Sequence, residues 1–371
     1  MTKIRQEQLA DQITHYGMAR QAIMNGNFDV WQRGTSVALI DSTVTYQADR
    51  WLDYVGKDGG TLPTLTRSRQ NLTPGSVQNA FYLSRLTTNG AGTSLGVNSW
   101  GYYQQKIEHG VRSLCGSGKK VTVSFRASSD IATKRIGVTL MQYYGSGGSP
   151  SAAEFILSTP ITLTSTPTEY TVTFTTNTLS GKTFGTNNDD YIGLRFYYMW
   201  GTTFGNTYVQ TGVTVETFVG AGNIDIAQVQ LCSGDVALPF QPKSFEEELR
   251  ACQRYYEKSY NYEIAPATAT TLGAYYSSIH TAYLLSDGHV KFSITKRTTP
   301  TVTLYSSNGT TSGVGSEYNN ASTFVADRAI SVSGNIGNNG MWAGGTAGNF
   351  TTTAFPNGSF MRFHWVADAE L

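Results

Sequence analysis

The sequence predicts an all-β protein: a jelly-roll β-sandwich, one short amphipathic helix and a small C-terminal β domain. Three observations favour this class. Short runs alternate apolar and polar residues, turn residues separate these runs, and Gly (39 residues) and Tyr (22) are abundant among the 371 residues. We expect four parts: an extended or helical N-terminal arm at 1–24, the jelly-roll domain at 25–240, a linker helix at 241–262 and the small β domain at 263–371.

The arm is polar and permits a helix, but its apolar residues are too sparse for a clear amphipathic pattern. Two interpretations stay open: it orders against a partner or a neighbouring copy, or it is a frayed terminus. The jelly-roll domain follows, with about nine short strands and no intervening helix, which is typical of an antiparallel sandwich. Its clearest strands are Ala80–Leu86, Trp100–Ile107, Lys120–Ala127, Ile136–Tyr144, Glu169–Thr175, Tyr191–Trp200 and Asn223–Leu231.

Period-two alternation gives the direction of side chains in these strands. In the strand at 191–200 the predicted core set is Ile192, Leu194 and Phe196. The predicted outward set is Arg195, Tyr197 and Met199.

The linker helix is the only strongly specified helix, and we place it at Ser244–Lys258. Ser244 and Glu247 fit a capping box. One apolar stripe recurs at steps of four, three and four: Phe245, Leu249, Cys252 and Tyr256. A helix this short needs a packing partner, either its own domain or copies of itself. The stripe is therefore our candidate for an oligomer seam.

The C-terminal domain shows strand patterns again. They cover Leu272–Leu285, Val290–Thr295, Thr301–Ser306, Ala329–Ser333 and Phe360–Val366. The Gly- and Asn-rich stretch Asn335–Asn349 is expected to be a long loop.

Composition excludes several function classes. The net charge is +1 and 14% of residues are charged, so the basic stripe of a nucleic-acid binder is absent. The three cysteines have no C-x-x-C spacing, which predicts free thiols and synthesis in a reducing cytoplasm. The N-terminal sequence has no secretory h-region and no run approaches spanning length, so we expect no membrane insertion.

Several segments together carry a family resemblance. NGNFDVWQRGTS, the following ADRW, IDIAQVQLCSGDVALPFQPKSFEEELRACQRYYEKSY and KRTTPTVTLYS resemble a module of tail-fibre and other structural proteins of tailed bacteriophages, in order over about 25–306. That module is similar to a carbohydrate-binding jelly roll followed by a short helix and a small β domain. The resemblance implies a virion structural protein, often trimeric, at the host-contacting periphery.

Aromatic residues provide the candidate binding site, because sugars stack their C–H faces on rings. In each Tyr-Tyr pair, one ring should point inward and one outward. The predicted glycan-binding set is Trp100, Tyr103, Tyr143, Arg195 and Tyr197. The alternative is that these rings fill the sandwich or a subunit interface.

Metal and catalytic signals are weaker. Jelly-roll sugar-binding modules often hold a structural calcium near their first and last strands, where Asp29 and Asp225 stand here. Salt pairing or turn capping is the favoured alternative for both, and no other cofactor is expected. Gly92–Gly96 matches G-x-S-x-G but lacks the strand–helix context of a nucleophile elbow. The acids Asp189-Asp190 and Glu246–Glu248 lie in a turn and a helix start, so no catalytic residue is assigned.

The sequence therefore predicts a non-enzymatic phage virion protein. It would be a homotrimeric tail-fibre or receptor-binding component at the outer surface of the tail or capsid. The arm would dock on other virion proteins, and the β domains would contact host surface glycans. One alternative is a capsid decoration, cement or head-fibre protein, and a second is a glycan depolymerase.

Overall fold

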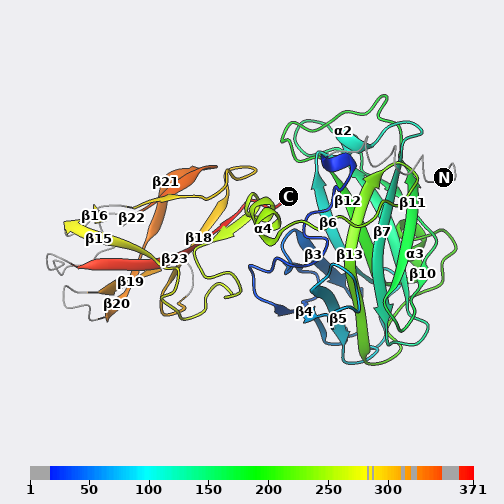
Figure 1. The fold of residues 1–371 in the computed structure, drawn as a ribbon, viewed down its shortest axis with the longest axis horizontal. Helices are drawn as coiled ribbons and strands as arrows, with labels where there is room; N and C mark the ends of the chain where they lie inside the picture. The colour runs from blue at the N-terminus through cyan, green and yellow to red at the C-terminus, as the bar shows by residue number, and fades with distance from the viewer. Residues whose placement is uncertain (1–16, 282–283, 286–287, 311–313, 319–323, 345–358) are drawn as a thin grey trace. The chain divides into compact units, whose positions relative to one another are not determined.

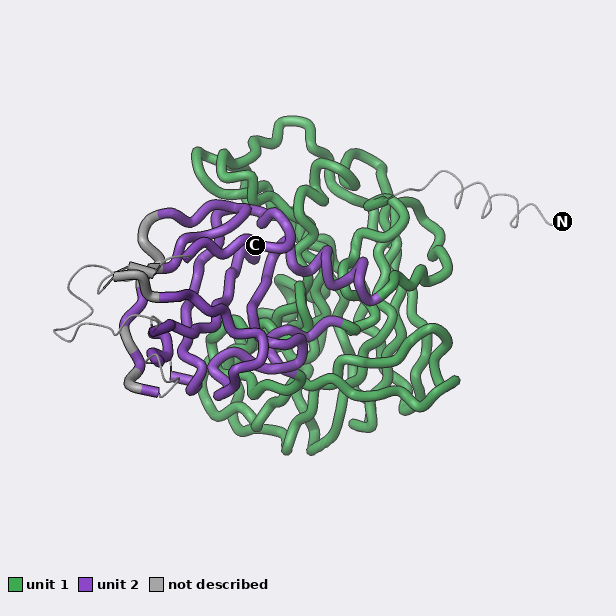
Figure 2. Tube along the Cα trace, turned by 60° about the vertical axis from the view of Figure 1, so that its left-hand side comes forward, with its two compact units in different colours: residues 1–29, 35–244, 371 green, residues 30–34, 245–370 purple. Residues whose placement is uncertain are grey.

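The computed structural model describes residues 17–281, 284–285, 288–310, 314–318, 324–344 and 359–371 (Figure 1). Most of the predicted docking arm lies outside these residues. The chain divides into two compact units (Figure 2): the described part of unit 1 is 17–29, 35–244 and 371, and unit 2 lies within 30–34 and 245–370. The predicted linker range is divided between them, because helix α4 (Phe245–Gln253) groups with unit 2.

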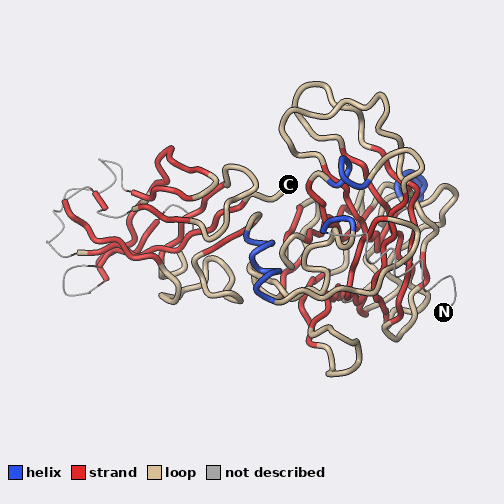
Figure 3. Tube along the Cα trace, turned by 45° about the horizontal axis from the view of Figure 1, so that its top comes forward, coloured by secondary structure: helices blue, strands red, loops and turns tan. Residues whose placement is uncertain are grey.

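Unit 1 is an antiparallel sandwich of two sheets, as the sequence predicts (Figure 3). The six-stranded sheet has the order β1 (Ser36–Ala38), β4 (Leu65–Asn71), β5 (Tyr82–Thr88), β13 (Gly222–Ser233), β7 (Lys120–Ser129), β11 (Thr168–Thr175). The seven-stranded sheet has the order β10 (Ile161–Thr162), β8 (Arg135–Tyr143), β12 (Tyr191–Trp200), β6 (Trp100–Glu108), β3 (Trp51–Gly56), β2 (Val44–Tyr46), with β9 (Glu154–Ile156) also paired to β8. The expectation of no helix between the strands is wrong: α2 (Gly110–Leu114) lies between β6 and β7 and α3 (Thr202–Tyr208) between β12 and β13, and the short η1 (Gly17–Ala19) precedes β1.

Aromatic rings fill the space between the sheets of unit 1. Trp51 on β3 lies 4.9 Å from Tyr103 and 5.3 Å from Phe28 between ring centroids. Phe125 of the six-stranded sheet meets Phe196 of the seven-stranded sheet edge-on at 4.9 Å. All five side chains are at most 1% exposed. These rings are the contact by which one sheet packs on the other.

A buried ion pair crosses the same interior. Arg67 on β4 donates from Nε and Nη2 to the two carboxylate oxygens of Asp53 on β3, at 2.9 and 2.8 Å. The guanidinium also lies 4.0 Å from the centroid of the Tyr103 ring. Burial lowers the pKa of Arg67, but the adjacent Asp53 carboxylate outweighs it, so the net shift is upward and the pair stays charged.

A second buried cation, Lys134, makes stability pH-dependent. Its Nζ lies 3.1 Å from Glu216 Oε1 and donates to the Thr217 carbonyl. Burial lowers the pKa of Lys134 from 10.5 to about 8, against the opposing charge of Glu216. Between these two pKa values the unfolded chain binds more protons than the folded one, so the free energy of unfolding should rise with pH, approaching about 1.4 kcal/mol per pH unit.

Urea unfolding between pH 8 and about pH 9.5, below the range where tyrosines titrate, checks this expectation. The wild-type midpoint should increase across the window. Lys134→Met should show a smaller increase than the wild type, because the methionine side chain carries no proton to lose, whereas the buried Cys115 thiol, whose pKa burial raises to about 12, is common to both proteins. A variant profile as steep as that of the wild type would assign the slope to another group.

Unit 2 contains two sheets, and the larger one is built around the last strand, β23 (Phe360–Asp368). The larger sheet contains β16 (Leu284–Leu285), β15 (Tyr275–Thr281), β23, β19 (Val314–Tyr318) and β20 (Phe324–Ala329), with β14 (Tyr256–Lys258) and β18 (Thr301–Ser306) also paired to β23. The smaller sheet is β17 (His289–Lys291), β22 (Gly340–Gly344) and β21 (Ser331–Gly337). Their shared core includes Phe292, Leu304, Met341, Phe363 and Trp365.

Two sequence predictions in this unit are corrected. The helix ends at Gln253, where the buried Lys296 donates to its carbonyl at 2.7 Å, and the predicted last turn is instead strand β14. The expected loop Asn335–Asn349 contains a β-hairpin, because Ile336 pairs with Met341 and Gly337 with Gly340 across the two-residue turn Asn338-Asn339. Residues 345–349 of that range lie outside the described residues.

Candidate functional site

The outer face of the seven-stranded sheet gathers rings around one guanidinium. We call this surface the aromatic face and define it by Tyr102, Tyr143, Phe155, Tyr191 and Arg195. Four strands supply it: β6, β8, β9 and β12. Antiparallel register aligns these side chains, since Tyr191 pairs with Tyr143 and Met141 pairs with Phe155. Cross-strand neighbours on one face come close enough for side-chain contact.

Arg195 is the central group of this face. Its Nε donates to Gln104 Oε1 at 3.1 Å, and its Nη1 donates to the Tyr197 hydroxyl at 3.0 Å. The guanidinium lies 4.5 Å from the Tyr102 ring centroid and 5.3 Å from that of Phe155. Within the described part of the chain, no carboxylate pairs with it. A cation held by neutral partners in this way keeps its charge available for a ligand oxygen.

Gly193 lies beside Arg195 on the same face of β12, and its missing side chain makes room for the Gln104 amide. A Cβ at this position would lie 2.6 Å from Gln104 Nε2, so the glycine leaves the amide of Gln104 where it can hold Arg195. Gln104 is 1% exposed, and its Nε2 donates to no acceptor among the residues that the structure describes. A buried amide donor without an acceptor is unusual in proteins and points to a further hydrogen-bond partner at this place.

The other end of the face is a tyrosine pair. The Tyr143 and Tyr191 rings lie 4.7 Å apart at an angle of 33°, and the Lys106 ammonium is 5.3 Å from the Tyr191 centroid. Burial raises the pKa of Tyr191 to about 12, and burial with the charge of Asp189 raises the pKa of Tyr143. Both hydroxyls therefore stay protonated at neutral pH and can donate as well as accept hydrogen bonds.

Helix α3 covers the adjoining part of the same sheet face. Phe204 stacks on Trp100 at 5.8 Å and meets Tyr197 edge-on at 5.7 Å. Tyr197 is completely buried, while Trp100 is half-buried. Tyr197 and much of the Trp100 ring therefore serve in packing, which is the alternative to sugar binding given for the predicted rings.

The structure brings four of the five predicted glycan-binding residues to this face and corrects the fifth. Trp100, Tyr143, Arg195 and Tyr197 all point to the outer side of the seven-stranded sheet. Tyr103 points inward, is 0% exposed and stacks on Trp51, so the expected outward orientation is wrong. The outward ring of that pair is Tyr102.

Three further members of the site were missed. The sequence predicts that Tyr102 points inward, and it marks Tyr191 only as the first residue of a strand. Phe155 belongs to a three-residue strand whose sequence shows no clear alternation. Met199 was expected outward and is buried, because a β-bulge between Tyr197 and Met199 reverses the alternation.

The predicted seam residues do not form one helical stripe. Cys252 and Tyr256 are buried, Leu249 is half-buried, and Phe245 is 47% exposed with its ring edge-on to Tyr262. Tyr256 lies on strand β14 under the Arg33 guanidinium, 3.5 Å from its ring centroid. An intermolecular seam on α4 would therefore involve Phe245 and Leu249.

Several of the weaker signals belong to structural contacts, whereas the salt-pairing or capping role of Asp29 stays a prediction. Asp225 accepts both hydrogen bonds of Arg85 at 2.7 Å, which is the salt-pairing alternative to calcium. Asp29 is half-buried, and no group of three metal-ligating side chains occurs among the residues with assigned positions. Asp190 holds His109 and Arg112, and Asp189 accepts from Ser146. Gly92–Gly96 is a loop without a following helix.

Cys115, Cys232 and Cys252 are free and buried, as predicted. No helix in the described ranges has the length and apolar character needed to cross a bilayer.

Comparison with known proteins adds a fold-level likeness. No protein-family model matches the chain, and no curated protein matches it. It is similar to the family 11 carbohydrate-binding module from Clostridium thermocellum in complex with a β-1,3-1,4-mixed-linked tetrasaccharide (11% identity, 54% of this chain and 96% of that chain, TM-score 0.27). A CBM22 xylan-binding domain from Paenibacillus barcinonensis (13%, 50% and 92%, 0.28) and the N-terminal cellulose-binding domain of Cellulomonas fimi β-1,4-glucanase C (18%, 57% and 95%, 0.24) are similar to a comparable degree.

Proposed function

We propose that this chain is a non-enzymatic glycan-binding protein and that the aromatic face of unit 1 is its binding surface. One observation carries the proposal: aromatic residues from three strands, Tyr102 of β6, Phe155 of β9 and Tyr197 of β12, contact Arg195, a guanidinium whose described partners are all neutral. Sugars present apolar C–H faces to aromatic rings and hydroxyls to polar groups. The face offers both, with the Gln104 amide packed over Gly193 beside Arg195.

The proposed biological setting is the surface of a tailed-phage virion, with the protein as a homotrimeric tail-fibre or receptor-binding component. The resemblance of NGNFDVWQRGTS, ADRW and the segment around α4 to phage structural proteins supports it. In a trimer, three weak sugar sites would act together and increase avidity without new contacts. A capsid decoration, cement or head-fibre role keeps the same sandwich and changes only its neighbours in the particle. Cryo-electron microscopy of assembled particles distinguishes the two placements.

A glycan array with neutral and carboxylate-bearing oligosaccharides tests the binding function. We expect the full chain to bind at least one class, and Tyr143→Ala and Phe155→Ala each to weaken that binding about tenfold, the ratio for a loss of about 1.4 kcal/mol. Tyr82→Ala is the matched control, because it removes a half-buried tyrosine from the six-stranded sheet.

A blank array would overturn the proposal, and so would unchanged binding by folded Tyr143→Ala and Phe155→Ala proteins. Incubation with the bound polysaccharide tests the non-enzymatic part. Chains of unchanged length are expected, whereas shortened chains would favour the depolymerase alternative.

A further inference from the structure

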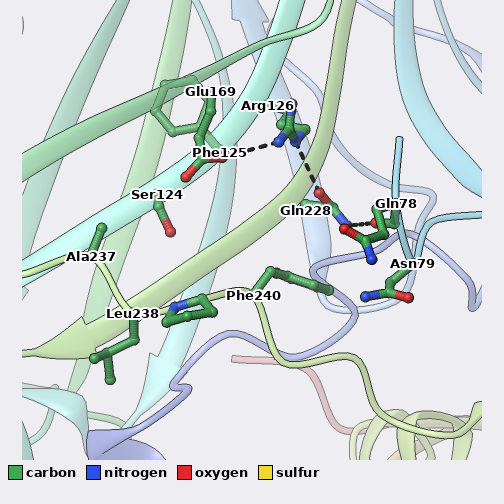
Figure 4. A pocket seen from close by; sticks show the side chains of 11 residues that line it. Gln78, Asn79, Ser124, Phe125, Arg126, Glu169, Gln228, Ala237, Leu238 and Phe240 are labelled. Atoms are coloured by element: carbon green, nitrogen blue, oxygen red, sulfur yellow. Dashed lines mark hydrogen bonds and ion pairs between the residues drawn. The ribbon is translucent and has the colours of Figure 1, made fainter. Parts of the chain in front are cut away.

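A separate cavity of about 420 Å³ lies on the outer side of the six-stranded sheet, away from the aromatic face. Strands β7, β11 and β13 form its floor, the β4–β5 loop forms one wall, and the segment after β13 forms the other. We call it the amide pocket; its side chains include Gln78, Asn79, Ser124, Arg126, Gln228 and Phe240 (Figure 4).

A β-bulge in β13 directs Gln228 into this pocket. The register between β13 and β7 shifts between Ala227 and Gln230, and Gln228 takes φ 49°, a left-handed value that a non-glycine residue seldom adopts. Its Nε2 donates to the Gln78 carbonyl at 2.6 Å, and its Oε1 accepts from Arg126 Nε at 3.2 Å. Bulges of this kind re-aim a side chain, and here the amide is fixed at the floor of the cavity.

A second glutamine holds the opposite wall in place. Gln230 is fully buried; its Nε2 donates to the Leu238 carbonyl at 2.7 Å, and its Oε1 accepts from the Gln241 backbone at 3.1 Å. Arg20 adds a hydrogen bond to the Pro239 carbonyl at 2.7 Å. These bonds keep the segment that carries Phe240 beside the sheet, so the pocket is held open by the protein's own contacts.

The pocket's charges cancel and its other polar groups remain available. Arg126 Nη2 pairs with the exposed Glu169 carboxylate at 3.1 Å, so the lining has no net charge. Among the described residues, no hydrogen-bond partner is found for the Ser124 hydroxyl, Arg126 Nη1 or the side-chain amides of Gln78 and Asn79. The cavity therefore offers both donors and acceptors, with one aromatic ring at its wall.

The geometry points to a second carbohydrate site in the amide pocket, specific for a neutral sugar residue. Planar amides, a guanidinium–carboxylate pair and a hydroxyl match the mixed donor and acceptor character of neighbouring sugar hydroxyls. Phe240 provides an apolar contact for the sugar ring. A volume of about 420 Å³ falls within the size range of small-ligand sites. This site does not depend on the aromatic face, since the two lie on different sheets.

Saturation-transfer NMR of the full chain with the methyl glycosides of glucose, galactose, mannose and N-acetylglucosamine tests the inference. At least one glycoside should receive saturation. Gln228→Gly removes the amide and suits the left-handed backbone, and it should weaken binding about tenfold. Ser124→Ala should weaken it about fivefold, the ratio expected for one lost hydrogen bond.

Two controls separate this site from the aromatic face and from general damage. Asn188→Gly makes the same change at a left-handed residue outside the pocket and should bind as the wild type does. Tyr143→Ala should also leave these glycosides bound, even if the array experiment fails. Absence of saturation for all four glycosides, or wild-type binding by Gln228→Gly and Ser124→Ala, would overturn the inference.

Discussion

Replacing Asp53 with alanine should destabilise unit 1 by about 3–5 kcal/mol. The change leaves Arg67, which is 1% exposed, as an uncompensated cation between the two sheets. Its remaining neighbours include the rings of Tyr103 and Tyr198, which cannot replace two charge-assisted hydrogen bonds. Urea unfolding with hydrogen-exchange mass spectrometry of peptides from β3 and β6 would locate the loss in unit 1.

Two companion variants test whether the buried charge is the cause. Asp53→Leu combined with Arg67→Met removes both charges and should recover most of the lost stability. Asp235→Ala breaks the exposed Lys120–Asp235 pair and should leave the urea midpoint unchanged. A double variant as unstable as Asp53→Ala would mean that the shape of the pair, not its charge, is what matters.

Trp51→Ala is the second change with a large expected effect, again about 3–5 kcal/mol. Trp51 is fully buried among Phe28, Tyr103 and Phe196, and its Nε1 donates to the Asn25 carbonyl at 3.1 Å. The alanine leaves a cavity at the centre of the sandwich and a carbonyl without its donor.

Trp51→Phe is the matched control, because it keeps a stacked ring and should lose clearly less stability than the alanine. Calorimetry of the full chain, with exchange in β18 and β23 as the reference for unit 2, measures both. A loss below about 1 kcal/mol for Trp51→Ala would contradict the central packing role of this ring.

The main sandwich strands were predictable because their sequences alternate. Tyr191–Trp200 has the predicted bounds, and the other six predicted strands begin or end within two residues of the observed ones. Direction in β6 was not predictable. Its inward set contains Tyr103 and Gln105, and its outward set contains Tyr102 and Gln104. Because each set has one ring and one amide, the alternation does not indicate which set faces the core. Gln105 is tolerated inside because the Met24 backbone satisfies its amide.

The sites depend on features that leave little trace in one sequence. Helix α3 lacks an N-cap side-chain bond and a charged first turn, yet it covers Tyr197. The amide pocket is lined by five separate segments of the chain. Its floor depends on the left-handed backbone of Gln228, and a glutamine, unlike a glycine, gives no sign of that conformation in the sequence. Tertiary contacts, not local propensity, select these conformations.

Strand β23 gives unit 2 a particular order of assembly. The first half of this strand, 360–363, pairs with β15 and β19. The second half, 363–368, pairs with β14 and β18. These four partners are translated before Phe360, and they have no common strand to join until then. Unit 2 therefore folds only after synthesis reaches its final residues, while the strands of unit 1 are complete more than a hundred residues earlier.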